Sequence, residues 1–301
     1  MYLHEDFELF EDAIYNTANE FKLPIAIVEK DYFVTLFLKE IVKKQPDIVF
    51  KGGTSLSKCY KIIDRFSEDI DLNIAGYEKP GESRRKKLKE HIVSTINDLG
   101  FVLSNPENIR SRRDFNKYII DYPTHYNSAF LKQHLIVETA VFFRSYPTRT
   151  MLADSFVFNY LNNTGNSNII SQYELEPFEI SVQTAERTFV DKLFALGDYY
   201  LSGEIRGHSR HIYDLYKLLN EIEITDEIRV LVKMVRAERK DHKTCISAQD
   251  NIDMKSLLKE IAETEAYKDD YENITLPLLF IPVEYEEAIS AINKIIKENV
   301  F

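Results

Sequence analysis

Two short groups of residues have the types and the spacing to bind phosphate and a metal ion. The first, Gly52-Gly53-Thr54-Ser55, follows the apolar run 48–50. The second is the pair Asp69 and Asp71. Glycines let the backbone approach a ligand closely, and free N–H groups at a helix start attract phosphate. Alternating strand side chains place both carboxylates on one face, where they suit a divalent cation on a nucleoside triphosphate.

Each group also has an ordinary structural explanation. A diglycine after a strand is often only a turn, here with Thr54 as the cap of a helix over 54–64. An Asp-x-Asp pair is often a solvated strand face. The two groups occur together, in this order, within one predicted strand–helix–strand unit. Their combination therefore favours a nucleotidyl-transfer site.

The same residues resemble the motif of a known family. GGTSLSK followed by RFSEDIDL is similar to the first motif of the nucleotidyltransferase AbiEii/AbiGii toxin family, a branch of the DNA polymerase β-like superfamily. KLFAL at 192–196 resembles the family's Lys-Leu-x-Ala-Leu helix. RHIYDL at 210–215 resembles its Arg-Asp-x-x-Asp-Leu motif, with His211 where an acid is common. The resemblance covers about residues 45 to 220.

The resemblance implies an activity, cofactors and partners. We expect a Mg²⁺-dependent (or Mn²⁺-dependent) nucleotidyltransferase that moves a nucleoside monophosphate from an NTP to an acceptor. The expected acceptor is tRNA or another RNA, with a protein hydroxyl as an alternative. The resemblance further implies the toxin of a type IV-like toxin–antitoxin or phage-defence system, with an antitoxin protein as partner. The alternative function is a non-catalytic member that binds nucleotide or RNA and acts through a partner protein.

Roles for individual residues follow from the motifs. Asp69 and Asp71 are expected to hold the metal. The residues expected to bind the NTP are Gly52, Gly53, Thr54, Ser55, Lys58 and Arg210. The residues expected to take part in catalysis are Asp69, Asp71, Lys192, Asp214 and Glu138. Lys192 would reach the triphosphate as a point charge, as phosphate-binding lysines do.

The third carboxylate of the site has two candidates. Glu138 lies in HLIVETAVF and shares a strand face with Ile136 and Ala140, where an unpaired charge is costly. Its structural alternative is a pair with an arginine. Asp214 is favoured by the resemblance, and its alternative is a simple i,i+4 helix pair with Arg210. The sequence leaves the choice between the two open.

Composition limits the class of protein. Hydrophobic residues make up 44% of the 301 residues and charged residues 29%, an ordinary globular balance. The net charge of −11 argues against broad, unspecific binding to nucleic acid but leaves room for a local basic groove. Candidates for such a groove are Arg84, Arg85, Lys86, Lys87, Lys89, Arg110, Arg112, Arg113, Lys117, Arg206 and Arg210. The chain has no apolar run as long as a membrane span, an acidic amino-terminal stretch and two cysteines, so we expect a cytoplasmic enzyme.

Periodicity and turn residues predict an α+β fold. We expect a polymerase β-like core, a mixed sheet flanked by helices, with an all-helical C-terminal region. The expected domains are 1–45 (helices packing on the core), 46–184 (the nucleotidyltransferase core) and 185–301 (a helical domain completing the cleft). The predicted helices are 5–20, 24–43, 54–64, 82–98, 185–201, 209–220, 225–239, 253–265 and 283–299. The predicted strands are 47–51, 69–74, 100–103, 116–122, 133–143 and 178–182, with a loop around 162–166.

Overall fold

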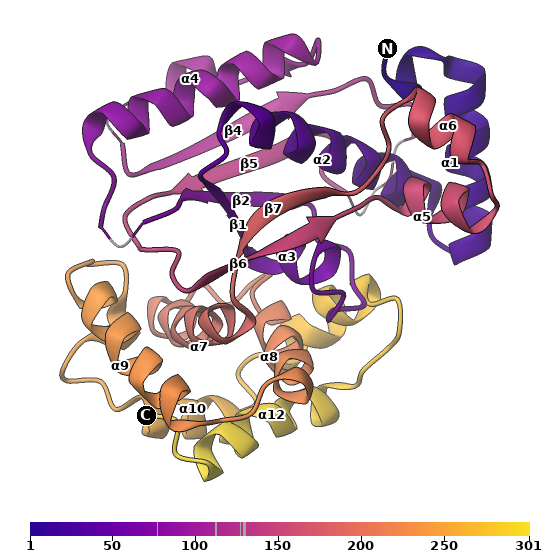
Figure 1. The fold of residues 1–301 in the computed structure, drawn as a ribbon. Coiled ribbons are helices and arrows are strands. Elements are labelled where there is room, and N and C mark those ends of the chain that lie inside the picture. The colour runs from indigo at the N-terminus through magenta and orange to yellow at the C-terminus, as the bar shows by residue number, and fades with distance from the viewer. Residues whose placement is uncertain (77, 112, 127, 129–130) are drawn as a thin grey trace. The chain divides into compact units, whose positions relative to one another are not determined.

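A mixed seven-stranded sheet organises the first part of the chain (Figure 1). Its order is β3-β4-β5-β2-β1-β7-β6. The strands are β1 (Ile48–Lys51), β2 (Asp69–Ile74), β3 (Val102–Leu103), β4 (Phe115–Asp121), β5 (Leu135–Ala140), β6 (Thr148–Ala153) and β7 (Phe178–Gln183). Strand β2 runs antiparallel to β1 and parallel to β5, and β1 runs parallel to β7. The predicted mixed sheet is confirmed.

The computed structural model describes residues 1–76, 78–111, 113–126, 128 and 131–301, so Arg112 lies outside the described residues. By their contacts these residues divide into two units. The first comprises Met1–Cys59 and Ser67–Gln183, and the second Tyr60–Phe66 and Thr184–Phe301. The segment 60–66 therefore belongs with the helical unit, although the chain on both sides of it belongs to the first.

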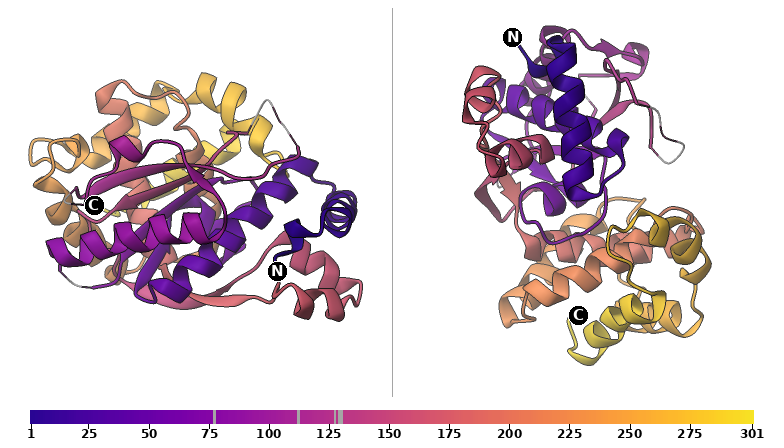
Figure 2. Two further views of the ribbon diagram at one scale, coloured as in Figure 1. Left: turned by 90° about the horizontal axis from the view of Figure 1, so that it is seen from above. Right: turned by 90° about the vertical axis from the view of Figure 1, so that its right-hand side faces the viewer.

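Helices cover the sheet of the first unit. They are α1 (Phe7–Phe21), α2 (Ile25–Lys44), α3 (Gly52–Lys58), α4 (Glu82–Asp98), α5 (Phe156–Asn163) and α6 (Ser167–Gln172). Helix α2 packs against α1, α4 and α5, and Figure 2 shows it beside α4. Because Val28, Phe33, Phe37 and Ile41 are all fully buried, α2 carries much of the core of this unit.

The second unit is helical apart from short turns. Its helices are α7 (Ala185–Ser202), α8 (Arg210–Glu221), α9 (Asp226–Lys240), α10 (Met254–Glu263), α11 (Lys268–Asp270) and α12 (Tyr285–Lys297). The Thr184 side chain caps α7 by accepting from the Arg187 amide, and Gly203 ends it in the left-handed conformation. Helix α8 packs against α7 and α12. No helix in the described part of the chain combines the length and apolarity that a bilayer crossing needs.

The segment after β1 differs from its prediction. Helix α3 begins at Gly52 rather than Thr54 and ends at Lys58 rather than residue 64. Thr54 is therefore the third helical residue and not the cap. The chain leaves the helix because Lys61 adopts a left-handed φ of 56° and residues 60–66 belong to the helical unit. The helix prediction for 54–64 was wrong in both bounds.

Strand β6 and helices α5, α6 and α11 were not predicted. Strand β6 lies at the edge of the sheet and exposes 57% of Leu152, so its pattern lacks a buried face. Helix α5 has the sequence FVFNYLNN, whose aromatic residues and asparagines are weak helix formers. Ser155 caps it by accepting from the Phe158 amide. Of the residues expected as a loop, Asn162 and Asn163 end α5, and residues 164–166 connect it to α6.

Candidate active site

The diglycine turn and the aspartate pair are in direct contact. Gly52 has a φ of +74°, and a Cβ on this residue would lie 2.0 Å from Oδ2 of Asp71. The Asp71 carboxylate therefore occupies the space that a side chain at position 52 would fill. The antiparallel pairing of β1 with β2, which sets Lys51 opposite Asp71, produces this approach. Only glycine is compatible with both the backbone conformation and the carboxylate.

The two aspartates share one face of β2, as the alternation predicted. Asp69 and Asp71 are partly exposed, whereas Ile70 and Leu72 are completely buried. Lys132 Nζ lies 2.6 Å and 2.9 Å from the two carboxylate oxygens of Asp69. No motif pointed to Lys132, because this partner lies in a loop between β4 and β5.

The hydroxyl groups after the glycines serve the fold. Thr54 Oγ1 donates to the Asp69 carbonyl at 2.5 Å and lies 2.9 Å from Ser67 Oγ. Ser55 Oγ donates to the Gly52 carbonyl at 2.9 Å, and both side chains are buried. The Thr54–Asp69 bond joins α3 to β2, and the Ser55–Gly52 bond lies within α3. The group in this turn that remains suited to phosphate is the backbone N–H row of the first helical turn, which the Lys51 side chain does not cap.

Glu138 lies beside Asp71 on the neighbouring strand. The parallel pairing of β2 with β5 sets Asp71 opposite Glu138, and β4 sets Lys117 opposite Glu138 on the other side. Lys117 Nζ donates to Glu138 Oε1 at 2.8 Å. Burial alone would lower the pKa of Lys117, but Glu138 outweighs it and raises that pKa. The partner of Glu138 is thus a lysine rather than the arginine that the structural alternative supposed.

Asp69 and Asp71 are the residues expected to hold a magnesium or manganese ion, and this stays a prediction. The described residues hold no group of three His, Cys, Asp or Glu side chains arranged as a ligand set. Magnesium at phosphoryl-transfer sites commonly takes one or two carboxylates and completes its shell with water and substrate phosphates. The Asp69 and Asp71 oxygens, beside the glycine turn that the Asp71 carboxylate touches, match that requirement.

Lys58 is placed differently from its expectation. Its ammonium group is buried and donates to Asp31 Oδ1 at 2.6 Å, Thr35 Oγ1 at 2.6 Å and the Asp154 carbonyl at 3.1 Å. An ammonium group has three donors. All three are used within the first unit, so in this arrangement Lys58 ties α3 to α2 and has no donor left for a nucleotide.

Lys192 and Asp214 form a buried ion cluster in the second unit. Lys192 Nζ lies 2.5 Å from Asp214 Oδ2. Arg65 donates to both oxygens of Asp214, from Nε to Oδ1 and from Nη2 to Oδ2, each at 2.8 Å. The Asp214 side chain is completely buried. Arg65 stands in the motif segment RFSEDIDL, but its partner 149 residues away cannot be read from the sequence.

The electrostatics of this cluster keep Asp214 ionised. Burial would raise the pKa of Asp214, but Arg65 and Lys192 outweigh it and hold that pKa well below its usual range. Burial lowers the pKa of Lys192, and the neighbouring guanidinium of Arg65 adds to this, while Asp214 opposes it. The cluster contains two cationic side chains and one carboxylate, so Asp214 has little capacity to accept a proton.

Arg210 and His211 begin helix α8. Arg210 forms no side-chain hydrogen bond or ion pair with another described residue, so the i,i+4 pair with Asp214 is not made. The His208 ring stacks on Tyr199 with centroids 3.4 Å apart, and the His211 ring lies 5.7 Å from Tyr199. Burial, assisted by Arg210, lowers the pKa of His208 to about 4.

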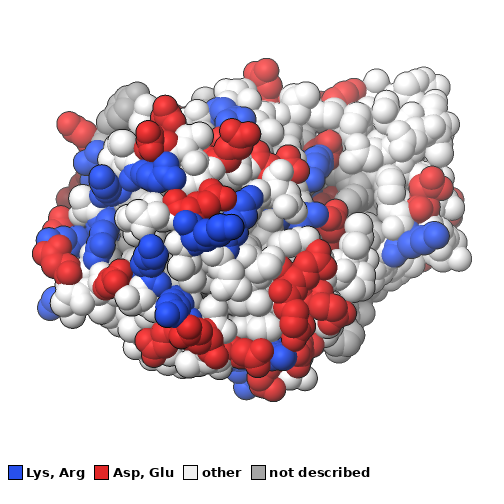
Figure 3. Space-filling model, turned by 90° about the horizontal axis from the view of Figure 1, so that it is seen from below, with Lys and Arg blue, Asp and Glu red and all other residues white. Residues whose placement is uncertain are grey.

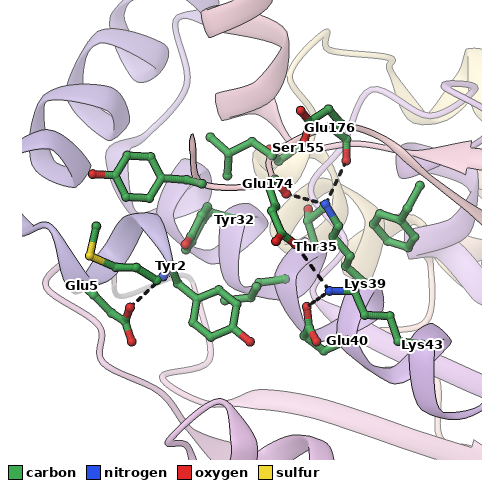
Figure 4. A pocket seen from close by; sticks show the side chains of 15 residues that line it. Tyr2, Glu5, Tyr32, Thr35, Lys39, Glu40, Lys43, Ser155, Glu174 and Glu176 are labelled. Carbon is green, nitrogen blue, oxygen red and sulfur yellow. Dashed lines mark hydrogen bonds and ion pairs between the residues drawn. The ribbon is translucent and has the colours of Figure 1, made fainter. Parts of the chain in front are cut away.

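A separate pocket of about 300 Å³ lies between the N-terminal residues, α2 and the segment 173–178 (Figure 4). Lys39 donates to the carbonyl groups of Glu174 and Glu176, and Lys43 Nζ lies 2.7 Å from Glu40. Both lysines are therefore engaged, and the other charged residues of the lining are glutamates. None of the expected site residues lines this pocket, and its charge does not suit a triphosphate.

The basic residues expected to form a groove are partly neutralised. On α4, Arg84 lies 2.6 Å from Asp47, and Arg85 pairs with Asp114. On the face that Figure 3 draws, acidic and basic side chains are interspersed. An RNA-binding surface remains a prediction.

Comparisons with known proteins agree with the fold. The structure resembles MenT4, a nucleotidyltransferase toxin from Mycobacterium tuberculosis, with a TM-score of 0.62 over 95% of this chain and 88% of that chain. The sequence identity is 15%, so this likeness concerns the fold alone. No curated protein sequence matches the chain. A family model described as "Nucleotidyl transferase AbiEii toxin, Type IV TA system" matches residues 36–291. The chain therefore belongs to the AbiEii nucleotidyltransferase toxin family of type IV toxin–antitoxin systems.

Proposed function

We propose that this protein is a divalent-metal-dependent transferase that moves a nucleoside monophosphate from an NTP to a hydroxyl group of RNA, with tRNA as the first candidate. The observation that supports the proposal most is the close approach of the Asp71 carboxylate to Gly52, the first residue of α3. A metal ion held by Asp69 and Asp71 would neutralise charge on the triphosphate. The first-turn amides at Gly52 and Gly53 would bind a phosphate group.

The reaction needs positioning and one proton acceptor. The acceptor hydroxyl attacks the α-phosphorus, a new oxygen–phosphorus bond forms, and the bond to the β-phosphate oxygen breaks as pyrophosphate leaves. The hydroxyl proton passes to a carboxylate. Glu138 is the better candidate because it lies opposite Asp71 on the same sheet face. Asp214 is the poorer base, because two cations hold its pKa low.

The test is a labelling experiment. The protein is incubated with each α-labelled NTP, Mg²⁺ or Mn²⁺, total RNA and a cell extract, and RNA and protein are then resolved. We expect label in RNA of tRNA size, and a loss of at least about 100-fold in Asp71→Asn and in Glu138→Gln. The matched control is Asp98→Asn, an exposed aspartate of the same unit, which should transfer at the wild-type rate.

The outcomes separate the alternatives. Label in protein rather than RNA would make a protein hydroxyl the acceptor. Binding of NTP without transfer to any acceptor, unchanged in Asp71→Asn, would favour the non-catalytic binding protein. The family assignment also implies an antitoxin. Co-expression with the product of the neighbouring gene is expected to relieve growth arrest caused by this protein, and Asp71→Asn should cause no arrest.

A further inference from the structure

The cation that neutralises Asp69 is held in place by other residues. Lys132 Nζ contacts both oxygens of Asp69, at 2.6 Å and 2.9 Å. The Lys132 side chain is 41% exposed and that of Asp69 18%. An ion pair with this exposure is usually weak, because both side chains lose freedom and water screens the charges. The surroundings of Lys132 therefore decide whether the contact persists.

An ion pair between buried Lys30 and partly exposed Glu68 binds the Lys132 backbone. Lys30, whose side chain is completely buried, lies 2.6 Å from Glu68 Oε2 and also donates to the Lys132 carbonyl. The same Glu68 oxygen accepts the Lys132 N–H at 3.0 Å. Glu68 and Lys30 thus bind the N–H and C=O groups of one residue. Burying a lysine is costly unless it is paired and hydrogen-bonded, and this arrangement satisfies Lys30.

Lys79, another exposed lysine of the first unit, pairs with Asp114 at 2.5 Å with an exposure of 51%. The Lys132 backbone is fixed, so its ammonium group needs only side-chain rotations to reach or leave Asp69. A short tether of this kind raises the effective concentration of the ammonium at the carboxylate.

We propose that Lys132 is a placeholder cation, which occupies the Asp69 carboxylate in the metal-free protein and is exchanged for the divalent ion. Lys132 therefore competes with the metal and keeps metal affinity low until a nucleotide supplies further ligands. The proposal rests on the proposed function in one respect, that Asp69 is a metal ligand. It concerns Lys132 and its clamp of Lys30 and Glu68. Lys132 and Lys30 lie outside the motifs, and Glu68 lies within RFSEDIDL.

The test measures metal binding without nucleotide or turnover. Binding of Mn²⁺ alone to the nucleotide-free protein is followed by electron paramagnetic resonance and calorimetry. Lys132→Met should bind Mn²⁺ about tenfold more tightly than the wild type, because the competing charge is gone. Lys132→Arg keeps the charge and should bind as the wild type does. Lys79→Met, which removes another exposed lysine charge of the unit, should also bind as the wild type does. Circular dichroism checks that each variant is folded.

A double substitution assigns the effect to Asp69. In Asp69→Asn, adding Lys132→Met should give no further gain in Mn²⁺ affinity, since the contested carboxylate is absent. The proposal is overturned if Lys132→Met binds Mn²⁺ no more tightly than the wild type, or if neither protein binds it. It is also overturned if Lys79→Met gives the same gain. Tighter Mn²⁺ binding without nucleotidyl transfer would refute the proposed function alone, and transfer without the gain would refute only the placeholder.

Discussion

An aspartate meets a lysine in both units, at almost the same distance. Asp69 lies 2.6 Å from Lys132 in the first unit, and Asp214 lies 2.5 Å from Lys192 in the second. The first pair is partly exposed, whereas Asp214 is completely buried and also bound by the guanidinium of Arg65. The comparison shows that distance does not set the role of an ion pair. Burial and the number of partners decide whether its cation is replaceable.

The two sites therefore respond differently to an incoming ligand. At Asp69, water can compensate the charges during exchange, so replacing an ammonium with a metal ion costs little. At Asp214, removing any member would leave an uncompensated charge in a dry environment. We infer that the Asp214 cluster contributes to the stability of the second unit, while the Asp69 pair is a position of exchange.

The largest effect is expected for Asp214→Asn. Loss of the carboxylate leaves Arg65 and Lys192 buried together without a counter-charge, and we expect the free energy of unfolding to fall by about 3–5 kcal/mol. Urea denaturation measures it. The control is Asp226→Asn, an aspartate that is 94% exposed and should cost less than about 0.5 kcal/mol. Equal losses in the two variants would mean that burial does not set how much an aspartate contributes to stability.

Gly52→Ala should damage the first unit in another way. The new Cβ would meet Asp71 Oδ2 at 2.0 Å and displace the carboxylate. We expect nucleotidyl transfer to fall about 100-fold, as misplacement by about 1 Å can do. Gly203→Ala is a matched control, because Gly203 has nearly the same φ (+75°) and open space around it.

Both glycine variants should lose about 1–2 kcal/mol of stability from the left-handed backbone. Only Gly52→Ala should lose activity. If Gly203→Ala is equally inactive, backbone strain and not the position of Asp71 explains the loss.

A smaller effect concerns acid stability of the second unit. His208 has a pKa of about 4 in the folded protein, below the ordinary value of 6.5. Between these values the unfolded chain binds more protons, so stability falls as the pH decreases from 6.5 to 4. Because His208 is partly exposed, we discount its share to on the order of 1 kcal/mol.

His208→Phe keeps a ring against Tyr199 and cannot take up a proton. Its thermal stability should therefore decline less than that of the wild type over this pH range. His125→Phe, which alters an exposed histidine of the first unit, should leave the decline unchanged. Parallel curves for His208→Phe and the wild type would contradict the role of burial at this position.

The smallest effect is expected for Lys117→Met. Lys117 and Glu138 are 43% and 24% exposed, so their ion pair should contribute less than about 1 kcal/mol to the free energy of unfolding. Chemical denaturation tests this value. A loss as large as that of Asp214→Asn would mean that the ion pairs on the sheet face are as fixed as the buried cluster.

Local patterns predicted much of the fold. Helix α4 spans Glu82–Asp98, as predicted, because its helix formers end at Gly100. Strand β2 matches its prediction because alternating aspartates and aliphatic residues specify a half-buried strand. The helix over 54–64 failed because the segment after Lys58 is positioned by distant residues. The Phe280 amide, for example, donates to the Asp64 carbonyl at 2.7 Å.

In the candidate site, too, local features could be predicted and contacts between distant residues could not. The contact of Gly52 with Asp71 follows from a strand, a turn and an antiparallel neighbour, all within one short segment. The clamp on Lys132 does not follow from a short segment, because Lys30 lies 38 residues from Glu68 and 102 from Lys132. The burial of Lys58 could not be predicted from the sequence either, because its acceptors lie on α2 and before α5. Sequence patterns report side-chain spacing, whereas tertiary pairing decides which of those side chains is already engaged.

The allocation of Tyr60–Phe66 to the helical unit restricts how the protein can be divided. The chain passes between the units after residues 59, 66 and 183, so no single cut separates them. A fragment ending at Gln183 would retain Arg65 without Asp214, and one starting at Thr184 would retain Asp214 and Lys192 without Arg65. Neither fragment would contain all three residues of the Asp214 cluster. Proteolysis or truncation between Gln183 and Thr184 should therefore yield insoluble pieces rather than two folded domains.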